Sequence, residues 1–225
     1  ELNTKARRAM AVIDPLKIII TNYPKDKVEV FPAENNPTNQ EQGHRDLLFS
    51  RELYIERDDF MEEPVPGFRR LIPGGEVRLK YAYIIRCDQV IKNEAGQIVE
   101  LHCSYDPKTK SGTEGSSRKV KGTIQWVDAL TARHAELRLY DHLFTKSNPE
   151  ESGEGEDFTD YVNPESLITV TTALIESSLA QAKTGVPYQF LRSGYFVKDP
   201  DSTEGNLIFN RIVSLKDSWS KKQGK

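Results

Sequence analysis

The stretch Arg69-Arg70-Leu71-Ile72-Pro73-Gly74-Gly75-Glu76-Val77-Arg78-Leu79-Lys80-Tyr81 carries the strongest pattern in the sequence. Two arginines precede a Pro-Gly-Gly turn, and an alternating strand follows it. Period-two alternation places Val77, Leu79 and Tyr81 on one face of that strand and Arg78 and Lys80 on the other. A strand that presents cations on one face suits an anionic or base-like partner. Simple solvation is the competing interpretation, because exposed strands carry Lys and Arg to discourage edge pairing.

Length and composition favour a polar globular protein. The chain has 225 residues, of which 37% are hydrophobic and 29% charged, which suits one large all-β domain or two small barrels. We find no apolar run long enough for a membrane span and no apolar signal core at the N-terminus. Cys87 and Cys103 are the only cysteines and suggest no disulfide framework. We therefore expect a reduced, cytoplasmic protein.

The net charge is −3, which argues against a general polyanion binder, but the charge is unevenly distributed. Residues 69–92 carry six Lys or Arg and two acids, a local +4, whereas residues 145–160 carry one Lys and six acids, a local −5. A balanced protein with one concentrated basic region binds nucleic acid locally, if at all. The acidic stretch, 146–161, is predicted to be an exposed loop.

Short strands with closely spaced turns are predicted along most of the chain, with few short helices. A hairpin of residues 77–91 and 97–105, joined at Asn93-Glu94-Ala95-Gly96, is the strongest local prediction. The pattern indicates an all-β barrel or sandwich, and the length suits two barrels better than one. The other predicted strands are 9–13, a hairpin of 16–21 with 28–31, 45–49, 52–55, 118–127, 134–140, 167–174 and a hairpin of 186–198 with 207–215. Helical character is predicted for 57–63, for a turn beginning at Asn163, and for 177–182.

The sequence carries no recognisable catalytic or metal-binding motif. No Walker loop, HExxH, CxxC or GxSxG occurs, and the four histidines lack metal-ligand spacing. The carboxylate pairs Asp58-Asp59, Glu62-Glu63 and Glu150-Glu151 are interpreted as surface charge. Gly74-Gly75 is a turn rather than a phosphate loop, because no helix begins after it. We predict no catalytic residues, no metal and no cofactor in this chain.

Basic and amide groups near strand ends are the remaining functional candidates. Arg69, Arg70, Arg78 and Lys80 form one set, Arg8 precedes the first strand, and Gln189 and Arg192 lie in the last hairpin. Arginine binds phosphate or a guanine edge bidentately, and glutamine both donates to and accepts from a base edge. Sequence-specific RNA recognition targets unpaired, splayed bases. The neighbouring aromatics Phe68, Tyr81 and Tyr188 could stack on such bases or belong to the core.

The segment Arg8-Ala9-Met10-Ala11-Val12-Ile13-Asp14-Pro15 resembles the C-terminal anticodon-binding region of bacterial-type glutaminyl-tRNA synthetases. The resemblance covers essentially the whole chain in order. It continues through Gly74–Leu79, Arg118–Trp126, Glu136–Asp141, Asn163–Leu167, Gly194-Tyr195-Phe196 and Phe209-Asn210-Arg211.

This resemblance implies two β-barrels related to a ribosomal protein that binds 5S rRNA. It implies a discontinuous proximal barrel of residues 8–58 plus 162–220, a distal barrel of residues 59–145 inserted in the middle, and the acidic loop 146–161. Members of the family unstack all three anticodon bases of glutamine tRNA into separate pockets.

The resemblance also assigns residues to the bases. Arg8 and Gln189 match positions that contact the middle uridine, and Arg70 matches the arginine that reads the third base, a guanine. Arg78 matches an arginine at the wobble-base pocket, and Lys80 lies where some members have arginine. Three further matches have less defined contacts: Arg69, where lysine is common, and Arg192 and Ser218, near the anticodon. Gly67 replaces a glutamine that faces the anticodon in some members, so that contact is not expected here.

The family's catalytic domain, a class I nucleotide-binding fold with His-Ile-Gly-His-like and Lys-Met-Ser-Lys-like motifs, is not represented in this sequence. The resemblance implies that a parent enzyme uses ATP with magnesium to ligate glutamine to tRNA, and that this chain alone binds tRNA as a monomer without activating glutamine. Two alternatives remain open. One is the anticodon domain of an archaeal or eukaryotic type of glutamyl-tRNA synthetase, and the other is a ribosomal-protein-like binder of a bent rRNA helix.

Overall fold

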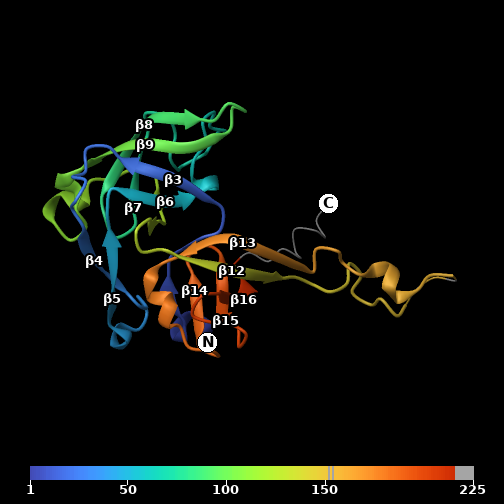
Figure 1. The fold of residues 1–225 in the computed structure, drawn as a ribbon. Helices are drawn as coiled ribbons and strands as arrows, with labels where there is room; N and C mark the ends of the chain where they lie inside the picture. Colours follow the sequence, from blue (N-terminus) through green and yellow to red (C-terminus); the bar gives the residue numbers. More distant parts are fainter. Residues whose placement is uncertain (152, 154, 216–225) are drawn as a thin grey trace.

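A computed structural model describes residues 1–151, 153 and 155–215 of the chain (Figure 1). The described residues form the expected all-β protein, with one short α-helix and several single-turn 3-10 helices. The helix and strands are α1 (Leu2–Lys5), β1 (Arg7–Ala9), β2 (Ala11–Val12), β3 (Pro15–Ile20), β4 (Glu29–Glu34), β5 (His44–Phe49), β6 (Glu52–Glu56), β7 (Glu76–Leu79), β8 (Ile84–Lys92), β9 (Ile98–Asp106), β10 (Thr123–Ile124), β11 (Val127–Asp128), β12 (Arg133–Tyr140), β13 (Leu167–Ile175), β14 (Pro187–Phe190), β15 (Gly194–Lys198) and β16 (Leu207–Ser214).

The strands form two seven-stranded sheets and one hairpin. Sheet A has the order β1-β14-β15-β16-β12-β13-β2, and sheet B has the order β10-β7-β8-β9-β3-β6-β11. The β4–β5 hairpin pairs only with itself and runs along one side of both sheets (Figure 1). One sheet approaches a closed barrel and the other a half-barrel.

Each sheet curls because its two edge strands are neighbours in the sequence. In sheet A, β1 and β2 are separated only by Met10, and in sheet B, β10 and β11 are separated only by Gln125 and Trp126. A covalent link of one or two residues holds the edges within a few ångströms of each other. We call these two joints the seams of sheet A and sheet B.

The seams face each other in the interior. Met10, from the seam of sheet A, belongs to the same buried cluster as Trp126 from the seam of sheet B. Both side chains are 1% exposed. Apolar packing across the seams therefore joins the two sheets.

An aromatic cluster fills sheet B beneath the β4–β5 hairpin. Phe49 packs edge-on against Trp126, Tyr23, Phe31 and Tyr83, with ring centroids 5.2–5.6 Å apart. Edge-to-face contacts at this distance are favourable beyond the area they bury.

A half-buried carboxylate ties the same hairpin to sheet B. Glu29 accepts hydrogen bonds from Tyr23 (2.7 Å), Tyr83 (2.8 Å) and Lys110 (2.9 Å). Its pKa is lowered to about 2, because these donors outweigh the opposing effect of burial.

The 69–81 stretch forms a shorter strand than predicted. Val77 and Leu79 are fully buried, as the alternation predicts. The strand ends at Leu79, however, because Tyr81 adopts a left-handed backbone with φ +67° and turns the chain into β8. The prediction of one strand over 77–91 is therefore wrong, whereas the hairpin around 93–96 is confirmed as β8 and β9.

Several other local predictions are wrong. Residues 118–127 form only the two-residue strand β10 and the start of β11, and residues 186–198 form two strands, β14 and β15, rather than one. Residues 16–21 and 28–31 do not pair as a hairpin, because β3 lies between β6 and β9 while β4 pairs with β5. The expected helix over 57–63 is a single 3-10 turn, η2 (Arg57–Asp59). No helix begins at Asn163, where a turn leads into β13, while the expected helix near 177–182 is the 3-10 turn η6 (Ser177–Gln181).

The sheets divide the chain at different points from the boundaries expected from the resemblance. Sheet B takes strands between residues 15 and 128, and sheet A takes residues 7–12 together with 133–214. β3 and β6, expected in the proximal unit, pair with β9 and β11 of sheet B.

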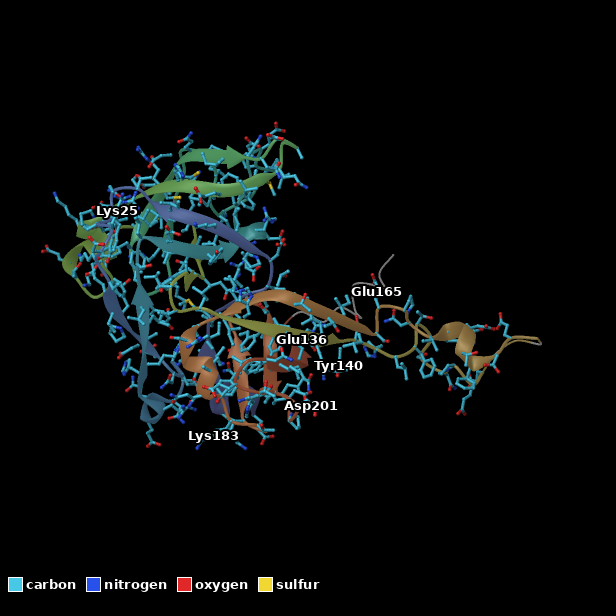
Figure 2. All side chains as sticks on the ribbon, in the orientation of Figure 1. Lys25, Glu136, Tyr140, Glu165, Lys183 and Asp201 are labelled. Atoms are coloured by element: carbon cyan, nitrogen blue, oxygen red, sulfur yellow. The ribbon has the colours of Figure 1, made fainter. Side chains whose placement is uncertain are left out.

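β12 and β13 extend as a two-stranded arm away from the body, and the described residues of 146–161 lie at its far end (Figure 1). Glu165, labelled in Figure 2, lies on this arm just past Tyr140, the last residue of β12, and farther from Glu136. The predicted acidic loop contains a 3-10 turn, η5 (Phe158–Tyr161), and its described residues are almost all exposed. Within the described part of the chain, no helix is both long and apolar enough to span a membrane.

Replacing Phe49 with alanine should destabilise the protein by about 3–5 kcal/mol, the usual effect of truncating a buried aromatic ring. Unfolding in urea followed by circular dichroism measures the change. Phe158→Ala is the matched control, since Phe158 is 50% exposed on the arm, and we expect a loss below about 1 kcal/mol there. Equal losses in the two variants would contradict the assignment of the core.

Candidate nucleic-acid interface

Arg8 and Gln189 come together although they lie at opposite ends of the chain. β1 pairs in parallel with β14, and the register places Arg8 opposite Gln189. Both residues are buried, with exposures of 6% and 9%. The parallel pairing therefore creates an arginine–glutamine pair at the edge of sheet A.

The Arg8 guanidinium is only partly used. Its Nη2 donates to Asn3 Oδ1 at 2.7 Å and to the Asn3 carbonyl at 3.2 Å. Its Nη1 is buried and has no hydrogen-bond partner among the residues that the structure describes. Buried donors are almost always paired in folded proteins, so an unpaired one calls for an explanation such as a ligand.

A pocket of ≈ 680 Å³ opens beside Arg8, between sheet A and the β4–β5 hairpin; we call it the Arg8 pocket. Lys183, at the bottom of sheet A in Figure 2, lines it. Its other lining residues are Arg7, Ala9, Asn35, His44, Arg45, Asp46, Ser177, Ser178, Leu179, Gln181 and Tyr188.

Glu176 organises one wall of the Arg8 pocket. Its carboxylate forms an ion pair with Arg45, and both side chains are nearly buried, with exposures of 4% and 9%. Glu176 also accepts the Met10 backbone N–H at 2.8 Å, at the seam of sheet A. The ion pair therefore fixes Arg45 beside the pocket.

Lys80 belongs to the same group of charged side chains as Arg8 and Arg45. Burial lowers the pKa of its ammonium, and the positive charges of Arg45 and Arg8 lower the pKa further while Glu34 opposes them. The ammonium lies 4.8 Å from the centre of the Tyr81 ring, a cation–π contact. The left-handed backbone of Tyr81 is one of two such non-glycine positions in the described chain. Strain of this kind concentrates at functional sites.

A second pocket lies at the junction of the two sheets and is lined by Arg70 and Arg192, the two arginines that contact the buried Asp59; we call it the Asp59 pocket. Arg192 Nη1 donates to both carboxylate oxygens of Asp59, at 2.6 and 2.8 Å. Arg70 Nε lies 3.2 Å from the same carboxylate, and its Nη1 donates to the Asp58 carbonyl at 3.0 Å. Arg192 is the other non-glycine residue with a left-handed backbone, φ +67°. The structure therefore brings Arg70 and Arg192 onto one acid.

The interpretation of Asp58-Asp59 as surface charge is correct for Asp58 and wrong for Asp59. Asp58 is exposed, whereas Asp59 is 0% exposed. Burial raises the pKa of the Asp59 carboxyl, and the two arginines oppose that rise. Their charges compensate a carboxylate that would otherwise be too unfavourable to bury.

The Asp59 pocket has a volume of ≈ 620 Å³ and a mixed polar lining. Gln125, at the seam of sheet B, is 2% exposed, and its Oε1 has no hydrogen-bond partner among the described residues. The remaining lining residues are Ile13, Asp14, Glu56, Asp58, Arg70, Arg192 and Leu215.

Arg78 is placed differently from Arg70. Its Nη1 donates to the Thr109 carbonyl (2.9 Å), and its Nη2 donates to the carbonyls of Ser116 (2.9 Å) and Arg118 (3.3 Å). Its guanidinium thus holds the loop between β9 and β10, and burial lowers its pKa.

Gly122 links Arg78 to Arg69. Its carbonyl accepts the Arg78 backbone N–H at 3.0 Å, and a Cβ at this glycine would lie 2.0 Å from the Arg69 carbonyl oxygen. The Arg69 side chain is exposed and makes no hydrogen bond or ion pair with described residues. Ser218 lies outside the described residues. Gly67, with φ +87°, lies in an exposed loop.

The comparisons with known proteins agree with this architecture. Residues 6–106 and 123–199 match two family models, both described as the anti-codon binding domain of class I tRNA synthetases (E and Q). The chain therefore belongs to the anticodon-binding domains of the class I E and Q tRNA synthetases.

Relatives in several bacteria carry the name glutamine–tRNA ligase. The chain is 50% identical to that of Rhodopirellula baltica over 100% of its length, 52% identical to that of Clostridium perfringens over 99%, and 53% identical to that of Ectopseudomonas mendocina over 97%. It spans between 37% and 40% of the length of these relatives.

Sequence reasoning did not identify Asp59, Gln125, Arg45 or Glu176 as functional residues. No local pattern marks them, since each acquires its role from residues far along the chain: Arg45 and Glu176 are 131 positions apart, and Asp59 and Arg192 are 133. One signal could have pointed to Asp59: it is an acid three residues after a strand, and a Pro-rich loop and paired arginines follow it.

Glu56 should make stability depend on pH. Burial raises its pKa from 4.5 to about 7, against the N–H groups of Ile13 and Asp14 that favour the charged form. Between pH 4.5 and about pH 7 the unfolded chain therefore ionises Glu56 first, and the free energy of unfolding falls as the pH rises. Glu56→Gln should flatten this decline in urea titrations at several pH values. Glu94→Gln, at the exposed β8–β9 turn, is the control; an unchanged slope in Glu56→Gln would contradict the assignment.

Proposed function

We propose that this chain recognises the anticodon loop of glutamine tRNA by taking its unstacked bases into separate pockets. The observation that carries the proposal is the Arg8–Gln189 pair, with a buried, unpaired Arg8 Nη1 beside an open pocket. A uracil presents carbonyl acceptors and one N–H donor on its pairing edge. An arginine donor and a glutamine amide provide complementary groups.

The other residues receive roles in the same scheme. Arg70, in the Asp59 pocket, reads the third base, a guanine, whose O6 and N7 suit a guanidinium. Lys80 and Arg78 contribute to the wobble-base pocket. Arg78 Nη1 and Nη2 already donate to three carbonyls, which leaves Nε and one hydrogen of Nη1 for a base. The exposed Arg69 suits a phosphate contact, since such contacts need charge more than fixed geometry. Arg192 acts near the third base, and Ser218 stays a proposal from the resemblance alone.

We further propose that the chain is part of a longer, monomeric ligase. The names of the relatives and the share of their length that the chain spans support the longer ligase, and the monomeric state is what the resemblance implies. In that enzyme another domain would use ATP with magnesium to attach glutamine, in the cytoplasm, to the tRNA bound here.

Binding of anticodon stem-loops tests the proposal. Arg8→Ala and Arg70→Ala should each weaken binding of the glutamine stem-loop by about 1–3 kcal/mol, the value of a base contact to arginine, in filter binding at low salt. Arg8→Ala should act when the middle base is uridine, and Arg70→Ala when the third base is guanine. Arg133→Ala, an exposed arginine on β12 outside both pockets, is the control. Equal binding of scrambled and cognate loops by the wild type would refute the proposal.

The same experiment separates the two alternatives. A glutamyl-type anticodon domain shares the middle base but prefers other wobble and third bases, so substitutions there identify it. An rRNA binder would favour a duplex with an internal loop and ignore the anticodon.

A further inference from the structure

We propose that Asp59 is a positioning residue for base recognition: its buried carboxylate aims the Arg70 guanidinium into the Asp59 pocket, with Arg192 as its second partner. This inference rests on the proposed function and extends it to a residue that itself need not touch the RNA. It concerns recognition at one pocket, and so makes different predictions for different bases of the loop.

The Arg70 guanidinium is held from two directions. Nε faces the Asp59 carboxylate at 3.2 Å, and Nη1 donates to the Asp58 carbonyl at 3.0 Å. Nη2 has no hydrogen bond to any described residue and lies on a side chain that lines the pocket. A guanidinium fixed through two nitrogens presents the third in one direction, which is the pre-organisation that base discrimination needs.

The backbone around Asp59 keeps acid and arginine in register. The Leu71 N–H donates to the Asp59 carbonyl at 3.0 Å, and the Met61 N–H donates to the Leu71 carbonyl at 3.1 Å. Phe60 and Leu71 form a β-bridge, and both are buried. Backbone hydrogen bonds therefore join the segments that carry Asp59 and Arg70, and they limit how far the carboxylate can follow a displaced arginine.

Arg192 brings sheet A into the same pocket. It lies in the β14–β15 turn, three residues after Gln189, and binds both oxygens of Asp59 through Nη1 alone. The pocket is thus complete only when the turn of sheet A is docked on η2. One hairpin places Gln189 opposite Arg8 and Arg192 on Asp59, so it contributes to both pockets.

Charge explains why the positioning group is an acid. Two guanidinium groups next to each other repel, and a single buried carboxylate between them offsets that repulsion. An asparagine has nearly the same shape but supplies no charge and only one acceptor oxygen. Asp59→Asn should therefore release both arginines, which would stay positive and still attract phosphate without a fixed direction.

The test compares stem-loops that differ only at one base. In wild-type chain, discrimination is the ratio of Kd for a loop with adenine at the third position to Kd for the loop with guanine. Asp59→Asn should lower this ratio about tenfold, the size of one good base contact, while the corresponding ratio for the middle base stays unchanged. Affinity for the adenine loop should not fall. Asp88→Asn removes an exposed carboxylate on β8 and is the charge-matched control.

If Asp59 had a purely structural role, Asp59→Asn would weaken the binding of all loops equally or leave the Kd ratios at both base positions unchanged. Either result would overturn the inference. If Asp59→Asn does not fold, as judged by circular dichroism, Asp59→Glu decides. This variant keeps the negative charge that compensates the two arginines, but its longer side chain moves the carboxylate out of register with Arg70 Nε. Discrimination at the third base should then fall, and an unchanged ratio would overturn the inference. A wild type without discrimination refutes the proposed function instead.

Discussion

A buried carboxylate between two guanidinium groups is the contact on which the junction of this protein depends. Asp59 has no exposed surface, and its partners Arg70 and Arg192 come from sheet B and from sheet A. Removing both partners would leave an uncompensated charge inside the protein, which typically destabilises by about 3–5 kcal/mol. Docking of the two sheets and formation of the Asp59 pocket are therefore energetically coupled.

A related arrangement, with one arginine instead of two, occurs a second time. Glu176 is buried, binds Arg45 and accepts the Met10 N–H at the seam of sheet A, beside the Arg8 pocket. Each pocket thus has one buried acid that fixes an arginine next to a seam. A curled sheet leaves backbone groups without ladder partners where its edges meet, and side chains must satisfy them. The seams are consequently the places where charged groups can be held in fixed positions.

The sequence predicts much of the local structure and little of the pairing. Alternation correctly predicts that Val77 and Leu79 are buried, and the β8–β9 hairpin follows from its turn residues. The pairing of β3 with β9 is parallel and joins residues more than 80 positions apart, so no local pattern could reveal it. The break at Tyr81 is also invisible locally, because a tyrosine with positive φ contradicts its own backbone preference and depends on tertiary packing.

The site shows the same limit. Charge and residue type identify Arg8, Arg70 and Gln189 as candidates, and the resemblance to a family assigns bases to them. That Arg8 lies opposite Gln189, or that Asp59 lies beneath Arg70 and Arg192, depends on long-range contacts that only the folded chain contains. An acid near an arginine in the sequence is usually solvated, and only its burial shows that it positions the arginine.

A crystal structure of this chain with the glutamine anticodon stem-loop tests the account most directly. It should contain an unstacked base within about 3 Å of Arg70 Nη2, while Asp59 still contacts both arginines, and a second base beside Arg8 and Gln189. A loop that stays stacked, or that binds away from both pockets, would contradict the account.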